Sequence, residues 1–291
     1  MKKSIILIAA TLIVVSGNTK AQEDQTTKDN TPVLSPFEHT LLIDDQTGMI
    51  PDKRTFSMTI QHRFGMMDNG ISDLFGIYSP GANIRIGLDY TILNRLDIGY
   101  GLTKQNMYND FQIKWAALQQ TISGSMPVSV TLYGNMAIDG RNKDQLGIYY
   151  DFLNRLSYFS QVIVGRKIND WLTIQVHGSF THYNIIDKNF DHDRFGVGGS
   201  GRIKFSSMSS VFFQFDTPLN IPSMVKNTSD SNLSKPNVGF GYEVSTGYHS
   251  FQFYLLNSKG ILPQENYMFN LNDFSKGEFM LGFTIIRMWS F

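Results

Sequence analysis

The sequence predicts an all-β fold, a transmembrane antiparallel up-and-down β-barrel of about 12 strands. Apolar and polar residues alternate along most of the chain. The alternating segments are long enough to cross a membrane, and the connections between them are short at one end and mostly long at the other. These features together are typical of a bacterial outer-membrane barrel.

Composition limits the class of protein before any motif is considered. The chain has 291 residues, with 25 Lys+Arg against 25 Asp+Glu. Charged residues make up 17%, compared with about 25% in a soluble domain, and aromatic residues make up 13%. This composition excludes a disordered chain and gives no basic excess for nucleic acid. Because Cys is absent, disulfides, thiolate catalysis and Cys-bound metals are excluded as well.

The N-terminus predicts export. Lys2 and Lys3 precede an apolar stretch over residues 5–15, and Thr19 and Ala21 are suitably small for a cleavage site. A membrane-spanning helix needs about 20 apolar residues, so this stretch is too short to be an anchor. We therefore predict a signal peptide over residues 1–21, cleaved after Ala21.

Residues 22–54 form a predicted periplasmic leader. The part up to Pro36 is polar and contains proline, which indicates a flexible segment. Residues 37–52 include the apolar string FEHTLLI. This string is compatible with an extra strand or with a plug inside the barrel, and the sequence leaves both alternatives open.

The barrel is predicted over residues 55–291. Between Asn83 and Asp89, for example, aliphatic residues occupy every second position, and Arg85 lies between two of them. The same period predicts strands at 55-64, 82-91, 95-104, 108-118, 127-137, 156-167, 171-183, 193-205, 209-216, 237-246, 249-257 and 277-290. Membrane strands need about 9 to 11 residues and soluble strands average about 5 to 6. A soluble sandwich with this pattern would also expose an apolar face on every strand.

The connections and the C-terminus favour the outer membrane. One end of the predicted barrel has short links, apart from 119-126, and the other end has mostly long ones. This asymmetry, with an even number of strands, places both chain ends in the periplasm. The last strand ends on Phe291, which resembles the signal read by the outer-membrane assembly machinery. Arg287 interrupts its lipid-facing side, but near the periplasmic end such a side chain can reach the interface.

Several strings carry a family resemblance. They are QHRFG at 61–65, NIRIGLDYTILNRLDIGYG at 83–101, SQVIVGRKINDWLTIQ at 160–175, THYN at 181–184, STGYHSFQFYLLNS at 245–258 and LGFTIIRMW at 281–289. From about Phe37 to the C-terminus the chain resembles an uncharacterised outer-membrane β-barrel family of anaerobic and gliding Gram-negative bacteria. The resemblance implies the fold and the outer-membrane location. It implies no reaction or ligand, so no functional residue is carried over.

The polar face of the strands gives the candidate site. The predicted lumen-lining residues are Arg63, Arg85, Asp89, Asp97, Lys114, His177, Arg202, Lys204 and Glu243. Charges of both signs indicate either a salt-bridged interior or a pore whose charges select solutes. Barrels of 8 strands are filled by side chains and barrels of 16 hold a channel, so 12 strands permit a narrow or a plugged lumen.

Glycines recur on the same face, at Gly87, Gly99, Gly101, Gly196, Gly198, Gly239 and Gly241. They either relieve crowding where the strands bend or make space for a solute or for residues 37–52.

The predicted function is a narrow channel for the passive passage or binding of small solutes. The alternative is a plugged structural barrel whose loops 138-155, 217-236 and 258-276 dock a surface partner. An acyl hydrolase is a third hypothesis, because His177, Ser179 and Asn184 resemble the residue types of an outer-membrane phospholipase on a twelve-stranded barrel. That nucleophile must face lipid, whereas the strand period turns His177 and Ser179 to the lumen, so we predict no enzyme activity.

No cofactor and no metal site are predicted. His182, Asp187, Asp191, His192 and Asp193 gather at one outer loop without a regular ligand spacing. The predicted partners are membrane lipid, the outer-membrane assembly machinery and a small solute, and no nucleic acid.

Overall fold

The computed structural model describes residues 29–34, 36–147 and 151–291. The predicted signal peptide lies outside these ranges, as do residues 22–28 and Ser35 of the predicted leader. Among the described residues, no helix is long and apolar enough to span a membrane.

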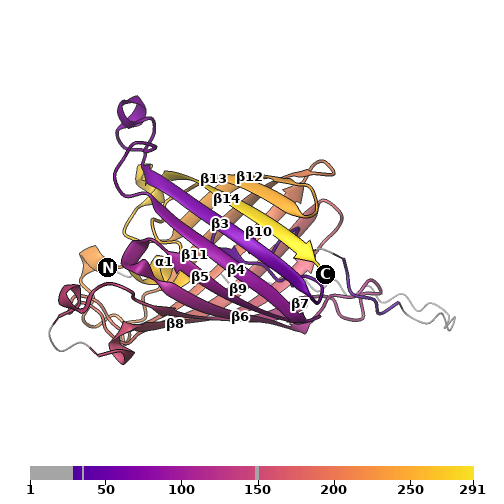
Figure 1. Cartoon of the computed structure of the whole chain (residues 1–291), viewed down its shortest axis with the longest axis horizontal. Helices are drawn as coiled ribbons and strands as arrows, with labels where there is room; N and C mark the ends of the chain where they lie inside the picture. Colours follow the sequence, from indigo (N-terminus) through magenta and orange to yellow (C-terminus); the bar gives the residue numbers. More distant parts are fainter. Residues whose placement is uncertain (1–28, 35, 148–150) are drawn as a thin grey trace, which may run out of the picture.

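Within these ranges, twelve antiparallel strands close into one barrel, in which each strand pairs with the next along the chain and β14 pairs with β3 (Figure 1). The strands are β3 (Thr55–Met66), β4 (Asn83–Leu93), β5 (Leu96–Thr103), β6 (Asn109–Leu118), β7 (Ser129–Ile138), β8 (Leu156–Lys167), β9 (Leu172–Tyr183), β10 (Asp193–Lys204), β11 (Ser209–Leu219), β12 (Asn237–Ser245), β13 (His249–Leu256) and β14 (Met280–Ser290). The predicted fold class is confirmed, and every predicted strand end lies within three residues of the observed end.

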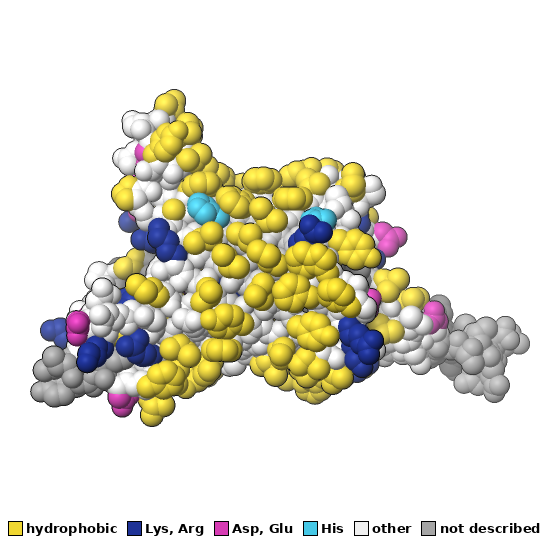
Figure 2. All heavy atoms as spheres, in the orientation of Figure 1, with side chains coloured by type: hydrophobic (Ala, Val, Ile, Leu, Met, Phe, Trp, Pro, Cys, Tyr) yellow, Lys and Arg dark blue, Asp and Glu magenta, His cyan; other side chains and the backbone are white. Residues whose placement is uncertain are grey.

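Burial follows the two-residue period. On β3, buried residues from Thr55 to Arg63 alternate with partly exposed ones. The interior side is polar and the exterior side apolar, which is the reverse of a soluble protein and suits a wall between lipid and lumen. Figure 2 shows the result as an apolar belt across the strands, with most charged side chains beyond its two ends.

The two ends of the barrel differ as the sequence predicted. The links after β4, β8, β10 and β12 are tight turns, and the links after β3, β7, β11 and β13 are long. By the usual asymmetry of bacterial barrels, the end with the tight turns faces the periplasm. Arg287 lies three residues before the end of β14 at this end, with its guanidinium 4.8 Å from the centre of the Trp289 ring.

The segment before the barrel folds into the lumen. β1 (Leu41–Leu42) and β2 (Asp45–Gln46) form a hairpin that pairs with no strand of the barrel. Phe37, Leu42 and Ile43 are at most 2% exposed and pack against side chains of β11 and β13. Of the two alternatives left open by the sequence, the structure shows the plug. Residues 37–52 are called the N-terminal plug below.

A second segment enters the lumen from the outer end. The link between β13 and β14 contains α1 (Pro263–Phe269), which contacts β8, β9, β10 and β11 (Figure 1). Tyr267 packs on Tyr133, Phe159 and Ile163 of the wall. Most of residues 260–270 of loop 258-276 are buried in the barrel, whereas Leu271 and Phe274 are 44% and 40% exposed. Docking of a surface partner by this loop stays a prediction, limited to the exposed end of the loop.

Six short 3-10 helices lie in the links within the described ranges. Their bounds are Gly70–Asp73, Gln105–Met107, Lys143–Gln145, Leu153–Arg155, Asp230–Asn232 and Phe274–Lys276.

Candidate functional site: the plugged lumen

The nine residues predicted to line the lumen all lie at inward positions of the strands. Eight of them are at most 6% exposed, namely Arg63, Arg85, Asp89, Asp97, Lys114, His177, Arg202 and Glu243. Lys204 lies at the periplasmic end, and its side chain is 30% exposed. The structure assigns partners to these side chains that the strand period did not identify.

Arg85 is held by a residue of the wall that the sequence analysis missed. Its Nε and Nη2 donate to the two carboxylate oxygens of Asp110, at 2.9 and 2.6 Å. Asn135 Nδ2 donates to the same carboxylate at 3.1 Å. Asp110 is in phase with Lys114 on β6, so extending the alternation to the start of that strand would have identified it.

Lys114 lies near two acids of the wall, Asp97 and Asp89, but it donates its hydrogen bonds to the plug. Its Nζ donates to the carbonyl oxygens of Thr40 and Met49, at 3.0 and 3.4 Å. Of those acids, Asp97 accepts from Thr91 Oγ1 at 2.9 Å, and Asp89 accepts from a side-chain amide of β6. An ammonium group of the wall therefore caps two carbonyl groups of the plug.

Arg63 joins the plug to the outer loop. It donates to Asp44 of the plug and, at 3.0 Å, to the carbonyl oxygen of Ser258. Asn266 of α1 donates to the other oxygen of Asp44 at 2.9 Å. One buried carboxylate thus connects the plug, the wall and the loop that carries α1.

The periplasmic end of the plug is held by ion pairs. Glu38 Oε1 lies 2.8 Å from Arg202 Nη2 and 2.9 Å from Lys204 Nζ. Burial acts to raise the pKa of Glu38, but these two cations outweigh burial and hold that pKa below its ordinary value. Glu38 is therefore a carboxylate at neutral pH. Arg202 Nε also lies 3.2 Å from Glu243 Oε1.

The glutamines of the wall bind the backbone of the plug. Gln214 Oε1 accepts from the Asp44 N–H at 3.0 Å, and Gln252 Nε2 donates to the Leu41 carbonyl oxygen at 2.9 Å. Gln61 Nε2 donates to the Ile43 carbonyl oxygen at 3.1 Å. These contacts supply the hydrogen bonds that a buried hairpin without neighbouring strands would otherwise lack.

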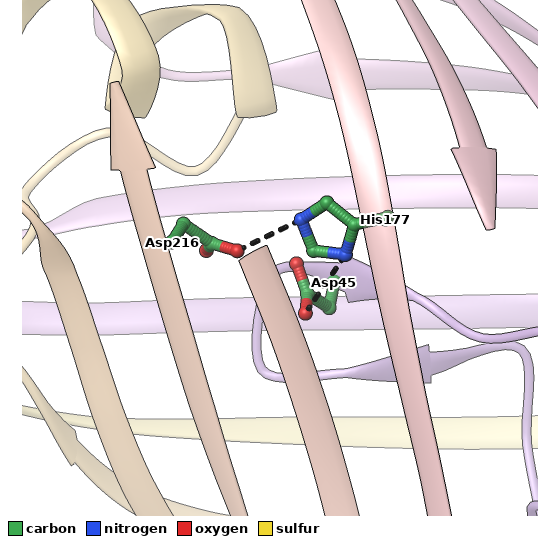
Figure 3. Close-up of side chains that lie close together, drawn as sticks. All are labelled: Asp45, His177 and Asp216. Atoms are coloured by element: carbon green, nitrogen blue, oxygen red, sulfur yellow. Dashed lines mark ion pairs between the residues drawn. The ribbon is translucent and has the colours of Figure 1, made fainter. Parts of the chain in front are cut away.

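His177 lies in a cluster of buried acids (Figure 3). Its Nε2 is 3.0 Å from Asp216 Oδ1 and 2.9 Å from the Tyr267 hydroxyl, and its Nδ1 is 3.8 Å from Asp45 Oδ2. Gly198 is the residue of β10 that pairs with both His177 and Asp216. A Cβ on Gly198 would overlap Asp216 Oδ1 and lie 2.5 Å from His177 Nε2, so glycine allows these two side chains to meet.

Other lumenal glycines make room for the two inserted segments. A Cβ on Gly239 would lie 2.6 Å from Ile43 Cδ1 of the plug. A Cβ on Gly196 would overlap the ring of Tyr267 on α1. The sequence left open whether these glycines relieve crowding or make space for a solute or for residues 37–52. At Gly239 the structure shows space for residues 37–52. At Gly196 the space holds the loop with α1, which the sequence did not predict inside the barrel.

The residues of the hydrolase hypothesis do not assemble. Ser179 and His177 both point inward, as the strand period predicted. Among the described residues, Ser179 Oγ has no hydrogen-bond partner, and the Nε2 of His177 contacts Tyr267 and Asp216 instead. Asn184 Oδ1 contacts His182 at 3.0 Å.

The outer loop after β9 is closed by its own polar contacts. His182 Nδ1 is 2.7 Å from Asp193 Oδ1, and His192 Nδ1 is 2.6 Å from the Tyr183 carbonyl oxygen. Asp191 accepts hydrogen bonds from the backbone of the link between β11 and β12. These side chains hold two outer loops together.

The lumen is wide at both ends and filled between them. A cavity of about 620 Å³ lies at the periplasmic end, lined in part by residues 31–34 and 48–53. A cavity of about 460 Å³ lies at the outer end, beside Tyr108, Tyr183 and Phe269. Where the plug meets the segment around α1, two cavities measure about 10 Å³ each. The space there has the size of one water molecule.

A comparison with protein families gives a match over residues 37–289 to the membrane bound beta barrel domain (DUF5777). The chain belongs to this family. The family membership and the resemblance of the sequence agree on a barrel of the bacterial outer membrane. The match begins at the first residue of the plug, so the plug is part of the family's domain. No protein with a curated function matches the chain.

Comparison with solved structures gives two outer-membrane proteins that are similar to this chain. The NanC porin is 10% identical, with 80% of this chain and 99% of that chain covered and a TM-score of 0.51. The COG4313 outer membrane channel from Pseudomonas putida F1 is 11% identical, with 83% and 97% covered and a TM-score of 0.49. At this identity the likeness to the NanC porin shows a common barrel fold.

Proposed function

We propose that this outer-membrane barrel is a channel for small polar solutes that the N-terminal plug closes. The observation that carries the proposal is that the plug is a hairpin inserted from the periplasmic end, with no strand pairing to the wall. Such a segment can leave without breaking the barrel. The porin fold of the NanC protein supports the same proposal at the level of the fold.

The contacts of the plug are of a kind that water can replace. The wall meets the plug with glutamine, lysine and arginine side chains, including Gln214, Lys114 and Arg202. A hydrogen bond exchanged for one to water changes the free energy by about 0.5 to 1.5 kcal/mol. The apolar contacts of Leu42 and Ile43 with β11 and β13 oppose withdrawal, because they are lost to water. The closed state is therefore favoured but reversible.

The class of solute follows from the charges of the wall. Basic and acidic side chains both face inward, as in the pairs Arg85–Asp110 and Arg202–Glu243. A lumen of mixed sign favours small polar solutes over ions of one sign. A barrel of twelve strands lies between filled and wide barrels, which limits the solute to small molecules.

Truncation of the plug tests the proposal. A chain that begins at Lys53 lacks the plug and needs no new junction, because β3 begins at Thr55. In planar bilayers we expect long-lived conductance steps from this chain, whereas the full-length chain is closed most of the time. Electrical silence of the correctly folded truncated barrel would contradict the channel.

The matched control is a chain that begins at Phe37, which keeps the plug and loses only the residues before it. We expect this chain to remain as closed as the full-length chain. Folding of all three chains is checked by the different migration of heated and unheated barrels in gels.

A second variant tests the plug by an internal deletion. It lacks residues 41–46 and joins Thr40 to Thr47, whose backbone atoms already form a hydrogen bond at 2.9 Å.

The charges of the wall are tested in the truncated chain. Arg202 and Glu243 face the lumen and lie 3.2 Å apart. We expect Arg202→Gln to shift the reversal potential in a salt gradient toward cation selectivity, and Glu243→Gln to shift it toward anion selectivity. Equal reversal potentials in all three chains would show that the current does not pass these side chains.

A surface-docking role is the second candidate, favoured by one outer loop. In the link between β3 and β4, Ile71 is 81% exposed and Tyr78 is 77% exposed. Exposed apolar side chains on a projecting loop are typical of a partner-binding surface. Co-purification of a stoichiometric partner that is lost in Ile71→Ser with Tyr78→Ser would support this role. A protein that acts only as a channel is not expected to co-purify with such a partner.

A further inference from the structure

Three buried side chains from three elements converge at the contact between plug and wall. Asp45 lies on β2 of the plug, His177 on β9 and Asp216 on β11, and they are 4%, 5% and 3% exposed. One ring nitrogen and one oxygen of each carboxylate all lie within 4.8 Å of one another (Figure 3). None of the hydrogen bonds that hold the plug elsewhere explains why two acids lie at this point.

The charges of this cluster are not balanced by its own members. Two carboxylates face one imidazole, so at least one negative charge remains even when the imidazole is protonated. The groups that donate to Asp216 Oδ2 are the neutral amides of Gln214 and Asn237, at 2.6 and 3.3 Å. A buried negative charge without a counter-charge costs several kcal/mol. The cluster therefore needs a proton or a cation.

Two of the atoms that face one another also lack hydrogen bonds. Among the described residues, Asp45 Oδ2 and His177 Nδ1 have no hydrogen-bond partner. Asp216 Oδ2 accepts from Gln214, and Asp216 Oδ1 lies 3.0 Å from His177 Nε2. A cavity of about 10 Å³ lies beside Asp45, Asp216 and Tyr267. Two of the three residues, Asp45 and Asp216, line this space, which has room for a ligand of about the size of one water molecule.

We propose that Asp45, His177 and Asp216 bind one divalent transition-metal cation, for which Zn²⁺ is the probe. One imidazole nitrogen and two carboxylate oxygens form a ligand set that Zn²⁺ accepts at about 2.0 to 2.2 Å. On one tetrahedral Zn²⁺, two such atoms lie about 3.3 to 3.6 Å apart. The three atoms here lie within 4.8 Å of one another, so binding requires the widest pair to close by up to about 1.5 Å. The absence of Gly198's side chain leaves the room for that closure.

The cation would connect the plug to the wall. Asp45 is carried by the plug, whereas His177 and Asp216 belong to neighbouring parts of the barrel. A cation bound by all three holds the plug in the lumen, and its removal weakens that hold. This regulatory role rests on the proposed function, but binding of the cation does not.

Binding is tested without reference to conductance. The full-length chain is stripped with a chelator, refolded into detergent and titrated with Zn²⁺ by calorimetry. We expect one equivalent to bind, and we expect Asp45→Asn and Asp216→Asn each to lower the affinity at least ~100-fold, since removal of outer partners alone costs about 10- to 100-fold. X-ray absorption of the bound Zn²⁺ is expected to show one imidazole ligand.

The matched control is His182→Asn, which removes a histidine paired with an aspartate at the outer surface. We expect this variant to bind Zn²⁺ as the full-length chain does. Absence of a bound equivalent in the full-length chain would overturn the site, as would equal affinity in Asp45→Asn; the cluster would then hold a proton instead.

The regulatory role is tested separately. We expect Zn²⁺ to lower the open time of the full-length chain in bilayers and to leave that of Asp45→Asn unchanged. If Zn²⁺ binds but leaves both open times unchanged, the regulatory role is overturned, whereas the cation site itself is supported. If the truncated chain gives no current, the proposed channel function is contradicted. The calorimetric titration still decides whether the cation site exists.

Discussion

Arg85 and Asp110 face each other inside the barrel, on β4 and β6, with side chains at most 6% exposed. Removing one partner of such a pair leaves a buried charge without compensation. We expect Asp110→Asn to lower the free energy of unfolding by about 3 to 5 kcal/mol, measured by urea unfolding followed through tryptophan fluorescence. The control is Asp170→Asn in the exposed pair with Lys167, where little change is expected. Equal effects at the two sites would contradict the dry environment of Arg85.

Gly196 tests the space inside the barrel at the scale of one methyl group, and Gly178, on the outward side of β9, is its control. A Cβ on Gly196 would overlap the Tyr267 ring, whereas a Cβ on Gly178 would meet no atom within 4 Å. We expect Gly196→Ala to destabilise the barrel by about 1 to 3 kcal/mol through overpacking, and Gly178→Ala to have almost no effect. Adding Tyr267→Leu to Gly196→Ala should recover part of the loss in urea unfolding. No difference between the two alanine variants would place α1 outside the lumen.

The side of the wall on which each charged residue lies was predictable, but its partner was not. Alternation fixes the direction of Arg63, Lys114 and Arg202, because lipid excludes their charges from the other face. Their partners include Asp44, the backbone of the plug and Glu38. These partners come from a segment without a period, so no spacing in the sequence connects the two.

At the scale of elements, α1 carries a titratable group into the lumen. Burial raises the pKa of Glu265 from its ordinary value of 4.5 to about 8, and Gln105 Nε2 donates to its Oε1 at 2.9 Å. The folded state therefore favours the neutral acid. This contribution to stability is full below about pH 4.5 and is lost as the pH rises to about 8.

The pH dependence of unfolding tests this placement of α1. We expect the midpoint of urea unfolding to fall between about pH 4.5 and 8, and to fall less in Glu265→Gln, which stays neutral. Asp144→Asn in an exposed outer loop is the control and should follow the full-length chain. The same slope in Glu265→Gln would contradict a buried acid at this position.

The strands were predictable and the two inserted segments were not, for one physical reason. Each strand separates lipid from lumen, so its sequence must alternate over eight residues or more. The plug is surrounded on all sides, and its two strands have two residues each, which leaves no room for a period. α1 has seven residues, too few for a helical stripe.

For the molecule as a whole, two segments from opposite ends meet inside one barrel. The plug enters from the periplasmic end and the loop with α1 from the outer end, and contacts such as Asn266 to Asp44 join them. The wall around them is polar, so it remains compatible with water when they move apart. The central claim is that the plug is the part that moves.

A reversible cross-link between plug and wall tests that claim within a single protein. A Cβ on Gly239 would lie 2.6 Å from Ile43 Cδ1. Because Cδ1 is two bonds from the Ile43 Cβ, the two Cβ atoms lie at most about 5 Å apart, and a small shift of the plug brings cysteines at both positions to the about 3.5 to 4.5 Å of a disulfide. The chain has no other cysteine. In bilayer recordings of Ile43→Cys with Gly239→Cys, we predict no openings while the disulfide is intact and openings after a reductant is added. Equal conductance before and after reduction would contradict the plug as the gate.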